Sequence, residues 1–452
     1  MRFKTMQAAI DYMMHTRRTR ITKRGLDEHT RNLTHTRKLL IKTGLPKNQH
    51  RQYCVITGSK GKGSTAAITA KLLETLGHKT GLITSPHLRY WNERIRINGQ
   101  AIPDADFMRI MDLLAPDIDA QIATMTDEQY LSPQGILLLV ALQWWDEEGV
   151  SAGVLEVGRG GRFDDMSILT NKVSLFTPIF TEHAQYLGES LERIAWHKAG
   201  IMTHGGYAFS VAQDPTVMRV LQKEADATES EFFWFSQRDL GKYISDTPNG
   251  IRFELGRYGE IDLPFYARHQ IQNATLAVQA VGNMHARLKG IDHRSPEYVE
   301  RIKQGLESVV WHGRLQKLQE NPAVYVDGAI NVNSAKDFLA SIENRLTHPI
   351  VTIIGVPTDR DVEGVYKIYA EASDSLIITE NNIHPYIHFP EKETSLALAR
   401  QYHEDVSHRK ILPDALELAY EKAGDTGTIL LGVAQPLVGE AMMIWDVDTL
   451  KI

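Results

Sequence analysis

The stretch "VITGSKGKGSTAAITAKLL", residues 55–73, decides the fold class of this chain of 452 residues. An apolar run leads into a loop with three glycines, two lysines and a Ser-Thr pair, and a helical pattern follows. Glycines let the backbone turn its N–H groups toward phosphate oxygens, and the start of a helix adds positive charge. The common G-x-x-x-x-G-K-[ST] spacing is not met, because Ile56 stands where that pattern has its first glycine. The stretch predicts a strand, a phosphate-binding loop and a helix; the alternative is an ordinary glycine-rich turn.

The loop also indicates which groups contact the phosphates. Lys62 supplies a point charge, the Ser64 hydroxyl can ligate Mg²⁺, and the helix is expected to begin near Gly63. The residues that we expect at the nucleotide are Gly58, Ser59, Lys60, Gly61, Lys62, Gly63, Ser64 and Thr65. The loop alone does not say what happens to the phosphate.

Composition excludes several classes of protein. The chain is 42% hydrophobic and 23% charged, and its net charge of -6 gives no basic excess that would indicate nucleic-acid binding. No apolar run approaches the roughly 20 residues of a membrane span, and the first residues lack the apolar core of a signal peptide. The single cysteine, Cys54, cannot form an internal disulfide. We therefore expect a cytoplasmic protein without nucleic-acid or membrane partners.

Strand-like apolar runs alternate with helical patterns in two series. The first series lies at 53–58, 80–84, 152–158 and 173–179, with helical patterns that include 105–124 and 133–147. Short apolar runs of this kind are typical of buried parallel strands, so we expect a P-loop-type, doubly wound α/β sheet with ligands at the carboxyl ends of its strands. The second series lies at 323–329, 349–355, 375–380 and 428–434, and it predicts a smaller Rossmann-like α/β domain.

The boundary between the two domains is predicted near Val310, which divides the chain into 1–310 and 311–452. Before this boundary, residues 237–263 alternate polar and apolar side chains around the turn sequences "NG" and "YGE". Such a pattern predicts a small antiparallel hairpin at the end of the first domain.

The order of short motifs along the chain resembles that of one family. The loop at 58–65 and "GLITSPHLRYWNERIRING" at 81–99 are similar to the phosphate-loop, S-P-H-L and E-R-I motifs of the folylpolyglutamate synthase and dihydrofolate synthase branch of the Mur ligase superfamily. The likeness continues in order through "LEVGRGGRFD" (155–164), "EH...LG" (182–188), "HKAGI" (197–201), "HQIQNA" (269–274), "WHGR" (311–314), "DGAINV" (327–332) and "DRDV" (359–362). Any one match would be weak, but so many in one order are highly specific.

The resemblance implies an ATP-dependent, ADP-forming ligase that joins a carboxylate to an amine. In that family the carboxylate attacks the γ-phosphate of ATP, an acyl phosphate forms, and the amine of an amino acid displaces phosphate. The reaction needs in-line positioning and neutralisation of charge on the γ-phosphate. The resemblance assigns ATP binding to residues 1–310 and amino-acid binding to residues 311–452.

The resemblance further implies two Mg²⁺ ions. Ser64 and Glu156 would hold the first ion, and His183 would reach toward the second ion, which a carbamylated Lys198 would also hold. The CO₂ adduct of a lysine is a hard anionic oxygen ligand and therefore suits Mg²⁺. Each residue taken alone has a simpler interpretation, since Glu156 could cap a helix, His183 could be a turn residue and Lys198 could be a solvated charge on a helix.

Three further positions match the ATP clamp of the family. Asn273 corresponds to an asparagine near the adenine, Arg314 to an arginine that reaches the phosphates from just past the hinge, and Asp327 to an aspartate that contacts the nucleotide across the cleft. The alternatives are a polar helix start, a surface ion pair and a helix cap, respectively. Catalytic roles are expected for Lys62, His183, Lys198 and Arg314.

Several positions depart from the family pattern and bear on the substrate. Ile330 replaces a histidine that lies near the phosphates, Glu182 replaces an aspartate, and His197 replaces a glutamate. Lys60 and Arg159 add cations beside the phosphates and the metal site, where they could favour a more anionic acceptor or could be solvated charges. The changes suggest a branch with an altered substrate.

The leading hypothesis is a ligase that adds an amino acid, with glutamate favoured, to a folate-like or other small carboxylate. A Mur-type ligase that extends a non-folate peptide or γ-glutamyl acceptor is the runner-up. A catalytically inactive nucleotide-binding relative would explain Ile330, and a kinase or simple NTPase would share the loop without needing an amine-binding domain. We expect a monomer; the acceptor, the amino acid and the number of additions stay open.

Overall fold

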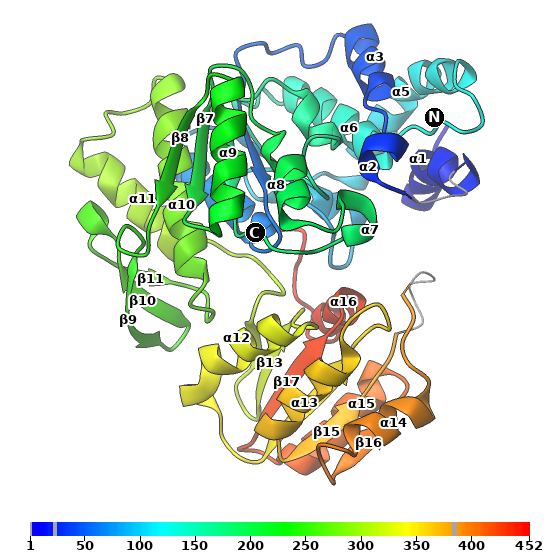
Figure 1. Ribbon diagram of the computed structural model, residues 1–452, viewed down its shortest axis with the longest axis vertical. Helices are drawn as coiled ribbons and strands as arrows, with labels where there is room; N and C mark the ends of the chain where they lie inside the picture. The colour runs from blue at the N-terminus through cyan, green and yellow to red at the C-terminus, as the bar shows by residue number, and fades with distance from the viewer. Residues whose placement is uncertain (1, 21–24, 382–386) are drawn as a thin grey trace.

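A computed structural model describes residues 2–20, 25–381 and 387–452. The chain forms two α/β domains, one above the other in Figure 1. The first contains an eight-stranded sheet and a three-stranded sheet, and the second contains a six-stranded sheet. The expected fold class is thereby confirmed, whereas the boundary at 310 and 311 stays a prediction.

The large sheet of the first domain has the strand order β4-β3-β2-β5-β1-β6-β7-β8. Strands β2, β5, β1, β6, β7 and β8 run parallel, and β3 and β4 are antiparallel additions at one edge. The strands are β1 (Gln52–Thr57), β2 (Thr80–Ile83), β3 (Ile95–Ile97), β4 (Gln100–Ala101), β5 (Ala152–Glu156), β6 (Val173–Phe176), β7 (Tyr207–Val211) and β8 (Glu231–Phe235). The phosphate loop follows β1 in the middle of this sheet, where parallel sheets bind ligands.

Helices cover both faces of the large sheet because successive residues of its strands point to opposite faces. Val55 joins the core on one face, whereas Cys54 and Ile56 join the core on the other. The first face is covered mainly by α1 (Met6–Arg20), α3 (Thr34–Thr43), α5 (Asp104–Ala123), α6 (Pro133–Glu147), α8 (Leu191–Ala199) and α9 (Pro215–Ala227). The second face is covered by α4 (Lys62–Thr75), α10 (Gln270–Arg287) and α11 (Pro296–Ser308). Two short helices, α2 (Asp27–Thr30) and α7 (Ala184–Leu187), complete this domain.

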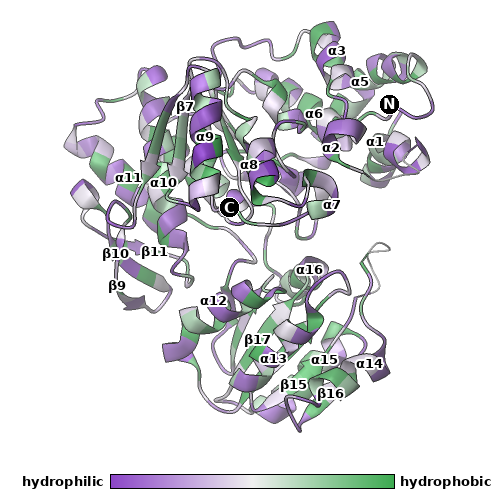
Figure 2. Cartoon of the chain, viewed as in Figure 1, coloured by the Kyte–Doolittle hydropathy of each residue, from purple (hydrophilic) through white to green (hydrophobic). Residues whose placement is uncertain are grey.

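The surface helices are amphipathic, as α9 illustrates. Its buried residues Val217, Leu221 and Ala225 recur every four positions and face the sheet. Figure 2 shows hydrophilic residues on the remaining surface of this helix and hydrophobic residues along the strands.

The segment expected to form a hairpin contains a three-stranded antiparallel sheet of order β11-β10-β9. Its strands are β9 (Lys242–Thr247), β10 (Gly250–Glu254) and β11 (Glu260–Leu263). Alternate residues such as Ile251 and Phe253 are buried in the core that α10 and α11 share. These two helices follow the small sheet before the chain enters the second domain.

The second domain has a sheet of order β12-β13-β17-β14-β15-β16, parallel except for β12. Its strands are β12 (Gln316–Gln319), β13 (Ala323–Asp327), β14 (Ile350–Gly355), β15 (Ser375–Ile378), β16 (Val406–His408) and β17 (Thr428–Val433). One face packs against α12 (Val332–Ile342), α13 (Val362–Ala372) and α14 (Lys392–Ala399), and the other against α15 (Leu412–Ala423) and α16 (Gln435–Ile444). Within the described ranges, no helix is long and apolar enough to cross a membrane.

Candidate active site

The phosphate loop connects β1 to α4, and glycine is required at two of its positions. Gly58 has φ of +148°, and a side chain there would collide with the hydroxyl of Thr177. Gly61 has φ of +85°, and a Cβ there would lie 2.6 Å from Oδ1 of Asn273. The helix begins at Lys62, one residue before the expected start. The loop therefore packs its backbone closely against Thr177, just after β6, and against α10.

The polar side chains of the loop already have partners that fix their directions. The Lys62 ammonium donates to the carbonyl of Gly58 at 3.0 Å, which folds this side chain back over the loop. The Ser64 hydroxyl is buried and accepts a bond of 3.3 Å from the amide of Gln270. This contact brings the first turn of α10 against the first turn of α4, and it places Gln270 and Asn273 beside the loop.

Glu156 is a buried carboxylate at the carboxyl end of β5, next to the loop. Its Oε2 accepts the backbone N–H of Ser85 at 2.9 Å, and a Cβ on Gly63 would lie 3.5 Å from both of its carboxylate oxygens. Burial raises the pKa of Glu156, and the charge of Lys62 opposes that shift. Among the described residues, Glu156 forms no ion pair, so the charge of this buried carboxylate is only partly compensated.

Lys198 on α8 lies behind the loop and is 1% exposed. Its ammonium donates to the Gly58 carbonyl at 2.8 Å and to Oε1 of Glu182 at 2.9 Å. Burial lowers the pKa of Lys198 to about 8, although the charge of Glu182 opposes the shift. The fold thus brings this lysine to the same backbone carbonyl that Lys62 contacts.

His183 lies beside Lys198 but is more exposed, with 40% of its side chain accessible. It adopts a left-handed backbone with φ of +50°, and its Nε2 lies 3.9 Å from Oε2 of Glu182. Within the described ranges no three His, Cys, Asp or Glu side chains converge as a ready metal site. Any metal here would need hydroxyl, lysine-derived or phosphate oxygens in addition to Glu156 and His183.

The second domain contributes Arg314 and Asp327. Oδ2 of Asp327 accepts the backbone N–H of Leu315 at 2.6 Å, and the Arg314 guanidinium donates to the Gly313 carbonyl at 2.9 Å. Desolvation raises the pKa of Asp327, whereas the nearby charge of Arg314 is the strongest influence that lowers it. The carboxylate therefore fixes the start of the second domain and also faces the cations near the cleft.

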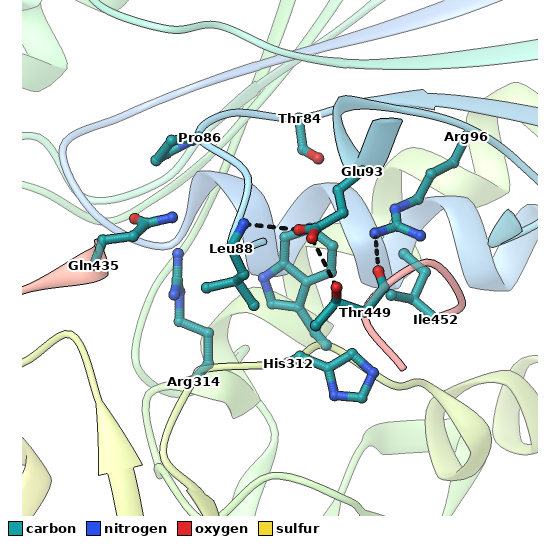
Figure 3. A pocket seen from close by; sticks show the side chains of 11 residues that line it. Thr84, Pro86, Leu88, Glu93, Arg96, His312, Arg314, Gln435, Thr449 and Ile452 are labelled. Atoms are coloured by element: carbon teal, nitrogen blue, oxygen red, sulfur yellow. Dashed lines mark hydrogen bonds between the residues drawn. The ribbon is translucent and has the colours of Figure 1, made fainter. Parts of the chain in front are cut away.

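A pocket lies between the two domains, beside these groups (Figure 3). Its lining comes from the segment between β2 and β3, from β3 itself, from the hinge, from the start of α16 and from residues 449 and 452, and it includes Leu88, Trp311, Arg314 and Gln435. The amide of Gln435 at the start of α16 donates to the carbonyl of His87 at 2.9 Å. The sequence does not indicate a chemical role for Gln435 or for Trp311, although Trp311 is the first residue of the "WHGR" motif.

The structure also locates the positions that depart from the family pattern. Arg159 binds Asp27, with Nε 3.0 Å from Oδ2, and its guanidinium lies 3.6 Å from the centre of the Tyr186 ring. Its positive charge is therefore matched by a buried carboxylate. Ile330 packs against the core of the second domain, and the next residue, Asn331, caps α12 by accepting the N–H of Ser334 at 3.0 Å.

Comparison with known proteins gives the class of this fold and site. The model of the Mur ligase middle domain matches residues 56–281, and the model of the Mur ligase glutamate ligase domain matches residues 313–432. The two matches lie in the two domains described above, which are therefore those of a Mur ligase.

Individual relatives narrow the assignment. The folylpolyglutamate synthase of Lacticaseibacillus casei is 30% identical over 364 residues, which cover 79% of this chain and 80% of the relative. A dihydrofolate synthase/folylpolyglutamate synthase of Bacillus subtilis is 28% identical, with 70% and 73% covered. The structure of Mycobacterium tuberculosis folylpolyglutamate synthase complexed with ADP has a TM-score of 0.82 and 26% identity, and covers 98% of this chain and 99% of its own. This chain belongs to the Mur ligase family, in the branch of the folylpolyglutamate and dihydrofolate synthases, and the expectation of an ADP-forming ligase that makes C–N bonds is confirmed.

Proposed function

We propose that this ligase adds glutamate to a folate-like carboxylate, and that the carboxylate is first activated as an acyl phosphate. The names of the relatives support the choice of folate and glutamate. The single observation that carries the mechanism is the convergence of Lys62, Lys198 and Glu156 on the loop after β1. Activation is required because a carboxylate anion resists nucleophiles and has a poor leaving group.

The phosphate loop would hold the phosphates of ATP through its backbone N–H groups and the start of α4. Lys62 would neutralise charge that develops on the γ-phosphate as the acceptor carboxylate attacks it, and Arg314 would do so from the second domain. Asn273, which lies against Gly61, is proposed to position the adenine side of the nucleotide. Asp327 would contact the nucleotide across the cleft.

Mg²⁺ would be held first by Glu156 and Ser64. The donor set fits this ion, because Glu156 is a buried carboxylate without an ion pair among the described residues and Ser64 adds a hydroxyl oxygen nearby. When bound, Mg²⁺ would neutralise phosphate charge and align the transferred group. The backbone N–H of Ser85 would keep Glu156 turned toward the loop.

A second Mg²⁺ is proposed near His183, with carbamylated Lys198 as the other ligand. The lowered pKa of Lys198, about 8, supports this modification, because only the neutral amine can add CO₂. The amine nitrogen forms a bond to the carbon of CO₂ and loses one proton, for which the adjacent Glu182 carboxylate is the nearest acceptor at 2.9 Å. The product is a carbamate anion whose oxygens would suit Mg²⁺.

The second domain would bind the incoming amino acid and close the cleft over the acyl phosphate. Excluding water matters there because hydrolysis of the acyl phosphate would waste the ATP. We propose that the enzyme works as a cytoplasmic monomer on small molecules.

A non-folate acceptor is the second candidate, and Ile330 and Lys60 favour it. The family histidine is absent at position 330, and Lys60 adds a cation near the phosphates. Arg159 no longer argues for an anionic acceptor, because Asp27 matches its charge. A catalytically inactive relative is disfavoured by the presence of both Glu156 and Lys198.

The test is release of ADP and phosphate with ATP, Mg²⁺ and bicarbonate, across a panel of amino acids crossed with dihydropteroate, reduced folates and other small carboxylates. We expect turnover that requires L-glutamate and a folate, and a product heavier by one glutamyl residue. Turnover only with another carboxylate would move the enzyme to the second candidate. Absence of turnover with every pair, together with absence of ATP binding, would overturn the proposal.

Two variants test the site itself. Glu156→Gln and Lys198→Arg are each expected to lower kcat by about 10²- to 10³-fold, because each removes an anionic ligand of a Mg²⁺ ion that would neutralise phosphate charge. Arginine keeps the positive charge but cannot form the lysine carbamate, so it separates the carbamate from a simple ion pair with Glu182. The matched control is Glu148→Gln on the exposed surface, where kcat should stay within about twofold.

A further inference from the structure

The chain returns to the first domain after α16. Figure 1 shows this last part leaving the second domain and ending beside the first. Residues 447–452, here called the return segment, extend the edge of the large sheet at β4. The Ala101 N–H donates to the Leu450 carbonyl at 2.8 Å, and the Ile452 N–H donates to the Gly99 carbonyl at 3.1 Å. Gln100 and Lys451 form an antiparallel bridge between these two bonds.

Two arginines of the first domain hold the backbone of the return segment. The buried guanidinium of Arg96 donates to the carbonyls of Thr449 and Leu450, each at 2.7 Å. Arg89 donates to the carbonyl of Val447 at 2.8 Å. A buried guanidinium that loses its acceptors is costly, so the fold favours the docked segment.

Thr449 makes the contact that leads toward the active site. This residue is 1% exposed, and its hydroxyl donates to Oε1 of Glu93 at 2.7 Å. The same carboxylate accepts the backbone N–H groups of Leu88 at 2.7 Å and of Arg89 and Tyr90 at 2.8 Å each. Figure 3 shows Glu93 between Leu88 and Thr449. The Glu93 carboxylate therefore binds three successive backbone N–H groups, and the hydrogen bond from Thr449 fixes the direction of this carboxylate.

The backbone held by Glu93 is part of the loop after β2, and this loop includes Ser85. The N–H of Ser85 donates to Oε2 of Glu156, the proposed Mg²⁺ ligand, at 2.9 Å. A continuous series of hydrogen bonds and a short stretch of backbone thus joins Thr449 to Glu156 through Glu93 and the loop.

We propose that the return segment is a positioning element for the ligase reaction: Thr449 orients Glu93, Glu93 shapes residues 85–90, and Ser85 holds Glu156 toward the phosphate loop. The inference rests on the proposed role of Glu156. Both residues also line the pocket of Figure 3, but in this proposal Thr449 and Glu93 act through other residues and are therefore positioning residues. The expected consequence of losing Thr449 is a weaker Mg²⁺ site in a folded protein.

The experiment compares Thr449→Val with Thr449→Ser. Valine has nearly the same shape but lacks the hydroxyl, whereas serine retains the donor. In Thr449→Val we expect the backbone amides of Ser85 and of residues 87–90 to exchange hydrogen about tenfold faster and the half-saturating Mg²⁺ concentration to rise about fivefold, as loss of a hydrogen bond to a charged group predicts. Thr449→Ser should stay within about twofold of the wild type in both measurements.

Thr428→Val is the matched control, because Thr428 is equally buried and its hydroxyl bonds at the far end of the second-domain sheet, to the Thr347 carbonyl at 3.0 Å. It should change neither the exchange of residues 85–90 nor the Mg²⁺ dependence. In a chain that lacks residues 447–452, both the hydrogen exchange of the loop and the half-saturating Mg²⁺ concentration should rise more than in Thr449→Val. Adding the free peptide VDTLKI should reverse both increases in part.

Different results would overturn the positioning role of Thr449 and the proposed function on which that role rests. Unchanged exchange of residues 85–90 in Thr449→Val would overturn the positioning role. Faster exchange with unchanged Mg²⁺ dependence would overturn the link to Glu156. Wild-type protein that binds no Mg²⁺ and ATP would overturn the proposed function, while the exchange measurement would still test whether the return segment holds the loop.

Discussion

Asp165 is a single side chain whose ionisation the fold controls. It is 3% exposed and follows the fully buried Asp164. Burial and the charge of Asp164 raise its pKa to about 6, although the Thr36 hydroxyl donates to it at 2.6 Å. Arg31 reaches Asp164 rather than Asp165, at 3.2 Å. Asp165 is therefore the less well neutralised of two adjacent buried acids.

The raised pKa predicts a pH dependence of stability. Between the unfolded value of 3.8 and the folded value of about 6, the folded protein binds the extra proton. The stability that Asp165 contributes is therefore complete below the unfolded pKa and is lost as the pH rises through about 6. A difference of about two pKa units corresponds to about 3 kcal/mol.

Asp165→Asn should remove this dependence, because asparagine stays neutral and can still accept the Thr36 hydroxyl. We expect the variant to be more stable than the wild type at pH about 7.5, with the difference shrinking or reversing toward pH about 4.5. Urea unfolding at several pH values measures this. An equal free-energy difference at every pH would show that Asp165 does not titrate in the folded protein.

Prediction from sequence at this scale depends on whether a residue belongs to a recognisable motif. Glu156 and Lys198 were proposed from ordered motifs, and the structure places both against the loop that begins at Gly58. Thr449 could not be proposed, because its role depends on a contact with Glu93, which is far away in the sequence. Glu93 lies in the quoted E-R-I motif, and that motif was the available signal for it.

At the scale of elements, two glycines distinguish the cost of backbone strain from the cost of a steric clash, one in the phosphate loop and one outside it. Gly61 and Gly149 both have a left-handed backbone, with φ of +85° and +66°. A Cβ on Gly61 would press on the Asn273 amide, whereas nothing lies within 4 Å of a Cβ on Gly149. Alanine would therefore strain the backbone at both positions, but its side chain would clash with a neighbour only at Gly61.

Gly149→Ala should lose about 1 kcal/mol of stability and keep its affinity for nucleotide. Gly61→Ala should lose a similar or larger amount and bind ADP at least about tenfold more weakly, because Asn273 and the loop must move apart. Thermal unfolding and calorimetric titration with ADP check both values. Equal ADP affinity in the two variants would contradict the close packing of the loop against α10.

The expected strands of the two sheets were found because parallel strands buried on both faces are short apolar runs. The strands at the edges of the large sheet are harder to predict from the sequence. Strands β3 and β4 have only three and two residues, and β8 is an edge strand with exposed aromatic residues. Strands β3 and β4 are too short to show a strand pattern, whereas β8 has four consecutive aromatic residues that the alternation of apolar runs and helical patterns did not single out.

At the scale of the whole molecule, the hinge sets how the two domains face each other. Gly313 and Leu315 both have positive φ, of +70° and +42°, and the Leu315 N–H is held by the Asp327 carboxylate. A non-glycine residue in this region is strained, and the bond to Asp327 helps to hold the hinge in this shape.

Asp327→Ala should release the hinge and broaden the distribution of domain orientations. We expect a larger radius of gyration by small-angle scattering and about tenfold weaker ADP binding, because the nucleotide would have to order the two domains when it binds. Asp359→Ala, at an exposed site in the second domain, is the control and should change neither value. An unchanged radius of gyration in Asp327→Ala would show that other contacts suffice to fix the hinge.

Because of the return segment, the chain passes between the two domains twice. Trp311 at the hinge and Ile452 in the return segment both pack against a core of the first domain. The second domain is thus connected like a cassette inserted into a loop of the first. Exchange of this cassette between ligases with different amino-acid substrates should therefore be made with one junction near residue 315 and the other before residue 447. A simple fusion at the hinge would replace the return segment as well.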